Sequence, residues 1–278
     1  MAETREELIK RLKEQAKEMR KIIIRTSEKA GQGHVAPAFS TVDITTALYF
    51  HIMKFDPKNP RMEDRDRYIL SAGHKCLLQY VALAMLGVYP MELLDTFDQF
   101  DTGLGGHPIY EKLPGIEAST GSLGHGLPLG LGMALAGKKD KKDYRVFAIL
   151  GDGECAEGTI WEAAMAAPKF KLDNLVAIVD YNKLCVDGPV AQVMPVEPFA
   201  DKWKAFGWAT KEIDGHNFEE ILDALENLPF EKGKPNAIIA NTVKGKGVSF
   251  IENQLSWHMR APSKEEAVAA LKEIEAMN

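Results

Sequence analysis

Cysteine is scarce in this 278-residue chain: there are three, Cys76, Cys155 and Cys185, and they are scattered along it. An odd number of thiols without metal-ligand spacing argues against a disulfide framework and against a zinc site. An excess of positive charge is also missing, because 34 basic residues face 40 acidic ones. The chain therefore lacks the basic footprint of a nucleic-acid-binding protein.

Long apolar runs are absent as well, and none approaches the roughly 20 residues that would cross a membrane. The N-terminal stretch is charged and helical in pattern, unlike a signal peptide. No repeat, linker or low-complexity tract interrupts the chain. We therefore expect a cytoplasmic protein in a reducing compartment, with neither a membrane nor a nucleic acid as partner. A hydrophobic content of 45% is ample for the core of one large domain.

The hydrophobic patterns predict alternating strands and helices. Spacings of the capping-box type at Thr4 with Glu7, and at Ser263 with Glu266, predict where the first and last helices begin. Alternation of this kind predicts an α/β fold in three layers, with a mostly parallel sheet flanked by helices. The predicted strands are 67–70, 145–150, 175–181, 207–213 and 237–241, and the main predicted helices are 4–30, 41–54, 74–86, 121–137, 155–167, 218–227 and the segment from 263 onward.

The most informative stretch is Gly151-Asp152-Gly153, which follows one apolar run directly, together with Asn182, which follows the next. A strand, a helix and a second strand of these lengths form a right-handed crossover unit, so the two strands should be parallel neighbours. Asp152 and Asn182 then lie just past the carboxyl ends of two strands, the edge at which open α/β sheets bind ligands. The glycines allow close backbone approach, and the amides of the following helix face an anion.

A carboxylate and an amide oxygen are hard ligands that suit Mg²⁺. A phosphate at this corner would be repelled by Asp152 and Glu154 unless a cation stood between them. The residues therefore predict a metal-bridged diphosphate site. Two other interpretations stay open at this point: an ordinary turn between strand and helix, and a nicotinamide fingerprint, which fits less well because the third glycine is Gly158.

Histidines gather in glycine-rich or turn segments. Several imidazoles around one cleft would suit sugar hydroxyls and proton transfer near neutral pH. His51, inside a helix, and His216, in a turn before a helix, are predicted to be structural. The stretch 244–262 is long enough to be a functional loop. The histidines in the glycine-rich or turn segments are His34, His74, His107, His125 and His258.

From Gly33-His34 to Pro262 the chain resembles the N-terminal half of transketolase, and most closely the N-terminal subunit of a split transketolase. The spaced motif from Gly151 to Asn182 is similar to the thiamine-diphosphate motif of that family. The stretches 65–74, 106–108 and 120–124 are further family-like blocks in the family's order. The resemblance implies a three-layer thiamine-diphosphate-binding fold, in which residues 1–278 form a single diphosphate-binding domain. The pyrimidine-binding and C-terminal domains would be absent from this chain.

The resemblance also implies how thiamine diphosphate and Mg²⁺ would be held. Asp152, Asn182 and the main-chain carbonyl of Leu184 would be the metal ligands. Gly153 and neighbouring amides would meet the diphosphate, with Glu154 part of the same cofactor site.

The resemblance also assigns residues to the remainder of the cofactor. By the same resemblance, His74 and Gly121 would line the cofactor site, and Leu123 would face the aminopyrimidine. Val186 would pack near the thiazolium ring. Glu157 would reach a subunit interface beside the catalytic glutamate of a partner.

Three histidines would act on the substrate. The resemblance implies that His34 and His258 handle protons on a sugar donor, and that His107 binds the donor's oxygens. In this family thiamine diphosphate serves as the electron sink for a two-carbon ketol unit that passes from a ketose to an aldose. The chain departs from the family's pattern at Ser122, His125 and Met259, so the sugars, expected to be sugar phosphates, stay open.

In this family a glutamate on the aminopyrimidine-binding domain activates the cofactor. By the resemblance that domain would be absent from this chain, which would then be active only with a partner subunit of about one further domain. A heterotetramer with two copies of each subunit is expected. Two alternatives remain: the diphosphate-binding subunit of another thiamine enzyme, such as a deoxyxylulose-phosphate-synthase-like protein or a 2-oxo-acid dehydrogenase, and a non-catalytic nucleotide-binding domain.

Overall fold

Five parallel strands form the sheet at the centre of the molecule. The computed structural model describes residues 3–277. The strand order is β1-β2-β3-β5-β4, and every neighbouring pair is parallel. The predicted parallel sheet is confirmed, and each predicted strand ends within two residues of its predicted bounds. The strands are β1 (Arg67–Leu70), β2 (Val146–Gly151), β3 (Leu175–Tyr181), β4 (Ala209–Asp214) and β5 (Asn236–Asn241).

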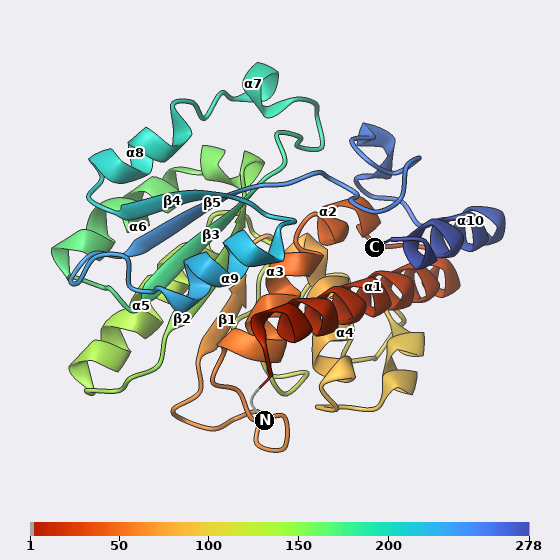
Figure 1. Cartoon of the computed structure of the whole chain (residues 1–278), viewed down its shortest axis with the longest axis horizontal. Coiled ribbons are helices and arrows are strands. Elements are labelled where there is room, and N and C mark those ends of the chain that lie inside the picture. Colours follow the sequence, from red (N-terminus) through yellow and green to blue (C-terminus); the bar gives the residue numbers. More distant parts are fainter. Residues whose placement is uncertain (1–2, 278) are drawn as a thin grey trace.

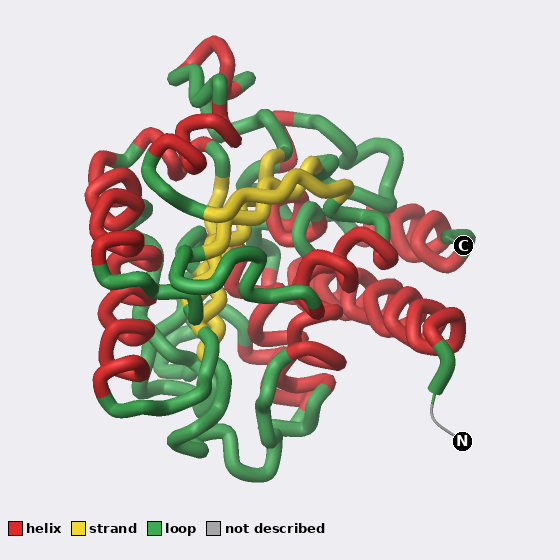
Figure 2. The backbone as a smooth tube through the Cα atoms, turned by 60° about the vertical axis from the view of Figure 1, so that its left-hand side comes forward, coloured by secondary structure: helices red, strands yellow, loops and turns green. Residues whose placement is uncertain are grey.

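Helices cover both faces of the sheet, so the predicted three layers are confirmed (Figures 1 and 2). A short helix, α7 (Val190–Val193), lies in the connection after β3. No helix between residues 3 and 277 combines the length and apolar character needed to cross a membrane. One face packs with α1 (Arg5–Ala30), α2 (Val35–Phe39), α3 (Val42–Ala47), α4 (Cys76–Met85), α9 (Phe218–Glu226) and α10 (Lys264–Glu275), and the other with α5 (Gly126–Lys139), α6 (Gly158–Lys169) and α8 (Phe199–Ala205).

The inner strands β2, β3 and β5 are largely apolar on both faces because both faces are covered. Along β2, Phe147 and Ile149 point into the core beneath α1 and α4, whereas Ala148 and Leu150 point into the core beneath α5 and α6. All four side chains are fully buried. A continuous apolar run is the pattern of a parallel strand that is buried on both sides.

The helix ends follow local capping chemistry. Both predicted capping boxes are present, at Thr4 before α1 and at Ser263 before α10.

The predicted helix 41–54 is α3 followed by a π-helical turn, Leu48–Ile52. Helix α2 was not predicted, because five residues are too few for a periodic pattern and Pro37 interrupts them. Proline is tolerated there because first-turn amides have no intrahelical partner.

The register of the strands brings their carboxyl ends to one edge. Gly151 at the end of β2 pairs with Asp180 of β3, and Tyr181 pairs with Asn241 at the end of β5. The segments that follow these three strands therefore start side by side. His34 joins them from another part of the chain through an isolated parallel bridge to Arg260. This edge holds the largest group of polar residues predicted to be functional.

Candidate active site

A cavity of about 370 Å³ lies at the carboxyl edge of the sheet. The residues around it come from segments that are far apart in the sequence. Two predicted site residues, His107 and Glu157, are not part of its wall. Eleven predicted site residues line it: His34, His74, Gly121, Leu123, Asp152, Gly153, Glu154, Asn182, Leu184, Val186 and His258.

Among the residues that the structure describes, the donors to the buried Asp152 carboxylate are main-chain amides. Its Oδ1 accepts from the Gly153 amide at 2.7 Å, and its Oδ2 accepts from the Lys183 amide at 2.5 Å. Its side chain is in no ion pair among the described residues, although it is only 2% exposed. Burial, reinforced by the nearby charge of Asp180, raises the pKa of Asp152 to about 6. Such a carboxylate is a candidate ligand for a cation.

Asn182 offers an amide oxygen at the same corner. Its Nδ2 donates to Asp180 at 2.9 Å, and its Oδ1 accepts from the Leu184 amide at 3.0 Å. These bonds fix the orientation of the side-chain amide. Within residues 3–277 no three His, Cys, Asp or Glu side chains are grouped to hold a metal ion. The oxygens of Asp152, Asn182 and the Leu184 carbonyl form a hard donor set that fits Mg²⁺.

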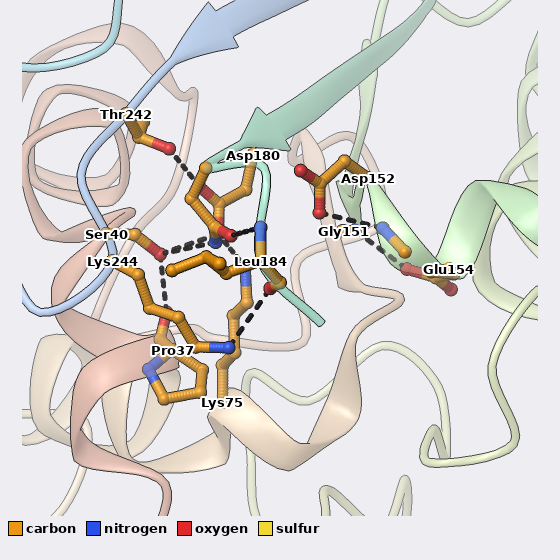
Figure 3. Close-up of polar contacts among 12 residues, drawn as sticks. Pro37, Ser40, Lys75, Gly151, Asp152, Glu154, Asp180, Leu184, Thr242 and Lys244 are labelled. Atoms are coloured by element: carbon orange, nitrogen blue, oxygen red, sulfur yellow. Dashed lines mark hydrogen bonds and ion pairs between the residues drawn. The ribbon is translucent and has the colours of Figure 1, made fainter. Parts of the chain in front are cut away.

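Asp180 accepts several hydrogen bonds from buried side chains, a role that was not predicted from the sequence (Figure 3). Its carboxylate is fully buried and accepts from Lys75 at 2.5 Å, Ser40 at 2.6 Å, Asn182 and also Thr242. Burial acts to raise its pKa, but the Lys75 ammonium and the hydrogen bonds lower the pKa overall. An acid inside the otherwise apolar run 175–181 was the only sign of this role. Nothing in the sequence marks Lys75 as its buried partner.

Removing the ammonium of Lys75 should destabilise the folded protein. The ammonium is 2% exposed and ion-paired to a carboxylate with no exposure. We expect Lys75→Met to lower the free energy of unfolding by about 3–5 kcal/mol at pH 7, since it leaves an uncompensated buried charge. Urea unfolding measures the loss. The double variant Lys75→Met, Asp180→Asn should recover much of it, and a stable single variant would contradict the prediction.

Glu154 holds the glycine-rich segments together. Its carboxylate accepts from the Gly124 amide at 2.9 Å, from the Gly151 amide at 3.0 Å and from the Ser71 hydroxyl. It is 3% exposed, and burial raises its pKa although the Ser71 and amide bonds act in the opposite direction. Glu154 lines the cavity as predicted, but its oxygens are used to join the end of β2 to the loop before α5.

Four imidazole rings gather at the other side of the cavity. The ring centroids of His34, His74 and His258 lie 5.2 to 5.7 Å apart, and that of His107 is 6.5 Å from His34. Burial, with the neighbouring His107, lowers the pKa of His34 to about 4. Burial also lowers the pKa of His74 well below its usual value. The rings of His34 and His74 are therefore neutral near pH 7 and can both donate and accept hydrogen bonds.

Lys244 contacts both halves of the site. Its side chain is 1% exposed, and Nζ lies 3.0 Å from the Leu184 carbonyl and 2.7 Å from Nδ1 of His258. Because the ammonium donates to Nδ1, the proton of a neutral His258 is on Nε2. Burial, with the Lys244 charge, lowers the pKa of His258 to about 3, and burial lowers that of Lys244 to about 8. The sequence singled out only the loop that Lys244 begins.

His107 and Glu157 lie at the rim. Gly121 has a φ of +139°, and a Cβ there would come within 2.7 Å of the His107 ring. The glycine thus lets His107 lie directly against the cavity wall, although its own ring is exposed. Glu157 is exposed at the start of α6, where a Cβ on Gly124 would meet it at 2.7 Å. His125 is also exposed and does not line the cavity.

Solved structures with this architecture are transketolases. A transketolase from Campylobacter jejuni matches with a TM-score of 0.89 and 33% identity, and one from Leishmania mexicana with 0.90 and 27%. Each match covers 95% of this chain, which spans 42% and 41% of the two longer chains. The fold and the edge site thus define an α/β domain of the thiamine-diphosphate-binding class.

Sequence comparison narrows this class to one family. Residues 12–278 match the family model described as transketolase, thiamine diphosphate binding domain. The 6-deoxy-6-sulfo-D-fructose transketolase subunit of Clostridium sp. (strain MSTE9) is 45% identical, over 95% of this chain and 96% of its own length. One subunit of the apulose-4-phosphate transketolase of Phocaeicola vulgatus is 42% identical, over 96% and 94%. The chain belongs to the transketolase family, and its full-length match to such subunits is that of an N-terminal split subunit.

Proposed function

We propose that this chain is the diphosphate-binding subunit of a two-subunit transketolase, which uses thiamine diphosphate and Mg²⁺ to transfer a two-carbon ketol unit from a ketose to an aldose. The observation that carries the proposal is the carboxyl edge of the sheet. There the buried, ion-unpaired Asp152 and the oriented amide of Asn182 share one cavity with three neutral histidines. A turn without a ligand has no need for an unpaired buried carboxylate.

The side of the cavity that holds Asp152 and Asn182 is assigned to the metal ion and to the diphosphate of the cofactor. Asp152, Asn182 and the Leu184 carbonyl would hold Mg²⁺, and Gly153 would let the diphosphate approach the backbone. A Cβ at Gly153 would lie 2.9 Å from the Cβ of Cys185, so only glycine fits at this position between Cys185 and the cavity. The Lys244 ammonium adds a positive charge that faces the same space. When bound, thiamine diphosphate supplies the electron sink for the transferred unit.

The histidine side of the cavity is assigned to the sugar. His34 and His258 line the cavity and are neutral near pH 7, so each can give or take a proton at a ring nitrogen. His258 would present Nε2–H, because its Nδ1 is held by Lys244. His107 would contact a sugar oxygen from the rim. The names of two relatives, which specify a sulfonated and a phosphorylated ketose, favour a donor with an anionic group.

A partner subunit would complete the site. Four apolar side chains around the cavity are exposed: Val186 by 59%, Val193 by 45%, Met194 by 55% and Met259 by 73%. Apolar groups gathered beside a cleft favour a surface that another protein covers. We assign this surface to a subunit with the pyrimidine-binding domain and the activating glutamate, in an assembly with two copies of each chain. Glu157, exposed just before α6, would lie at the same interface.

Calorimetry tests the cofactor assignment. We expect thiamine diphosphate to bind the chain with Mg²⁺ and to bind at least about tenfold more weakly when Mg²⁺ is removed by a chelator. A nucleotide that binds without Mg²⁺, in place of thiamine diphosphate, would favour a non-catalytic nucleotide-binding domain. With the partner present, ketol transfer from a ketose phosphate or sulfonate, compared with decarboxylation of pyruvate, separates transketolase activity from that of other thiamine enzymes.

A further inference from the structure

His216 does not line the cavity, but its ring contacts Asp43 and the backbone next to Lys244, which does line the cavity. Its Nδ1 lies 2.8 Å from an oxygen of Asp43 on α3, and its Nε2 lies 2.9 Å from the main-chain nitrogen of Val243. A backbone amide can only donate, so Nε2 must be unprotonated, and Nδ1 carries the proton that Asp43 accepts. The ring therefore joins a buried carboxylate to the chain just after β5.

The same carboxylate is held from the opposite side. Arg20 of α1 donates to both oxygens of Asp43, at 2.9 and 2.7 Å, and its side chain is 1% exposed. The Nε of Arg20 also donates to the main-chain carbonyl of Lys246 at 3.1 Å. Arg20 and His216 thus hold the backbone at residues 246 and 243, and Asp43 orients both of them. Charge-assisted bonds of this bidentate kind are geometrically specific.

Lys244 lies between the two held positions. Its Nζ reaches the Leu184 carbonyl and Nδ1 of His258, and the backbone on either side of it makes the contacts to His216 and Arg20. The turn that carries His216 is pressed against this segment, because a Cβ on Gly215 would lie 2.5 Å from the Thr242 methyl group. Only glycine permits that approach.

We propose that His216 is a positioning residue of the cofactor site. It holds the Val243 amide and thereby places the Lys244 ammonium at the Leu184 carbonyl and at His258. This role rests on the proposed function, since it acts on a site for thiamine diphosphate and Mg²⁺. His216 itself is not part of the cavity wall, so it acts on the site through the groups that its ring contacts.

Two amide variants separate the two contacts of the ring. His216→Asn keeps an N–H near the position of Nδ1 for Asp43 but removes the acceptor for Val243, whereas His216→Gln places an amide oxygen near the position of Nε2. In the full-length chain we expect His216→Asn to speed hydrogen exchange at the Val243 amide and to weaken binding of thiamine diphosphate with Mg²⁺ by about tenfold. His216→Gln should restore most of both.

A double-mutant cycle distinguishes positioning from general stabilisation. Lys244→Met alone should weaken cofactor binding, and adding His216→Asn should weaken it no further. Additive losses, or a His216→Asn chain that binds like the wild type, would overturn the positioning role alone. A wild-type chain that does not bind thiamine diphosphate with Mg²⁺ would overturn the proposed function, and the positioning role with it.

Discussion

Asparagine in place of Asp152 is expected to make the free protein more tolerant of alkaline pH while abolishing tight cofactor binding. The pKa of Asp152 is raised from 3.8 to about 6, chiefly by burial. A group of this kind contributes its full stability below pH 3.8 and loses that contribution as the pH rises through 6. At pH 8 the ionised carboxylate costs the folded state about 3 kcal/mol. The D152N variant has no such cost.

The free energy of unfolding is compared as a difference between D152N and the wild type, so that the contributions of the other titrating groups cancel. An asparagine amide must turn its NH₂ toward the amide of Gly153 or Lys183, which costs about 1–2 kcal/mol at every pH. The free energy of unfolding of D152N minus that of the wild type should therefore rise by about 1–2 kcal/mol between pH 5 and pH 8. Urea unfolding at the two pH values, without cofactor or divalent cation, measures this change.

Thiamine diphosphate with Mg²⁺ should reverse the order of stability. At 100 times its Kd, a ligand stabilises the wild type by about 2.7 kcal/mol. We expect the affinity of D152N to be lower by more than about 100-fold, because a charged ligand of a hard cation is lost. Asp187→Asn is the matched control, since Asp187 also lines the cavity but is exposed. Equal cofactor affinity of D152N and the wild type would remove Asp152 from the metal site.

The fold and the placing of Asp152 beside Asn182 were predictable because both follow from local patterns. Two apolar runs separated by a helix require a parallel crossover, and the residue after each run must lie at the carboxyl edge. Asp152 and Asn182 could therefore be placed together from the sequence alone. The order of the strands could not be predicted, because an apolar run shows that a strand is buried but not which strand lies beside it. Strand β5 lies between β3 and β4, although β4 precedes it in the sequence.

The charged network behind the site could not be predicted for a different reason. Lys75 and Asp180 are 105 positions apart, and Asp43 and His216 are 173 apart. A lone lysine or acid in a sequence is most often a solvated residue, and only tertiary contact reveals a buried pair. His216 was predicted to be a turn or cap residue because it follows Gly215 and precedes a helix. The structure places it in a turn, but with a buried carboxylate and a loop amide as its partners.

The isolated chain is expected to bind its cofactor and yet to show no ketol transfer above background. Four carboxylates line the cavity: Asp152, Glu154, Asp180 and Asp187. The first three are buried and accept bonds from backbone amides or buried side chains. Asp187 is exposed at the rim. Among the described residues, none of the buried carboxylates is left over to act on the far end of a cofactor held by Asp152 and Asn182.

Activity should return when a subunit with the pyrimidine-binding domain is added. A positioned acid–base group contributes about 10²–10⁴ in rate, so we expect a rise of at least about 100-fold that levels off at equal amounts of the two chains. The measurement is initial rate against partner concentration, with thiamine diphosphate, Mg²⁺ and both sugars in excess. Calorimetry on the same preparation shows whether the chain alone is folded and loaded. Full ketol transfer by a preparation that mass spectrometry shows to be free of any partner would refute this prediction.

The exposed methionines give a second readout that does not depend on turnover. Met194 and Met259 lie beside the cavity with 55% and 73% of their surface exposed. If the partner covers this rim, mild oxidation should convert both thioethers to sulfoxides in the free chain and much more slowly in the complex. An active complex in which both methionines oxidise at the free rate would place the partner on another face. The activating glutamate would then have to reach the cavity without covering its apolar rim.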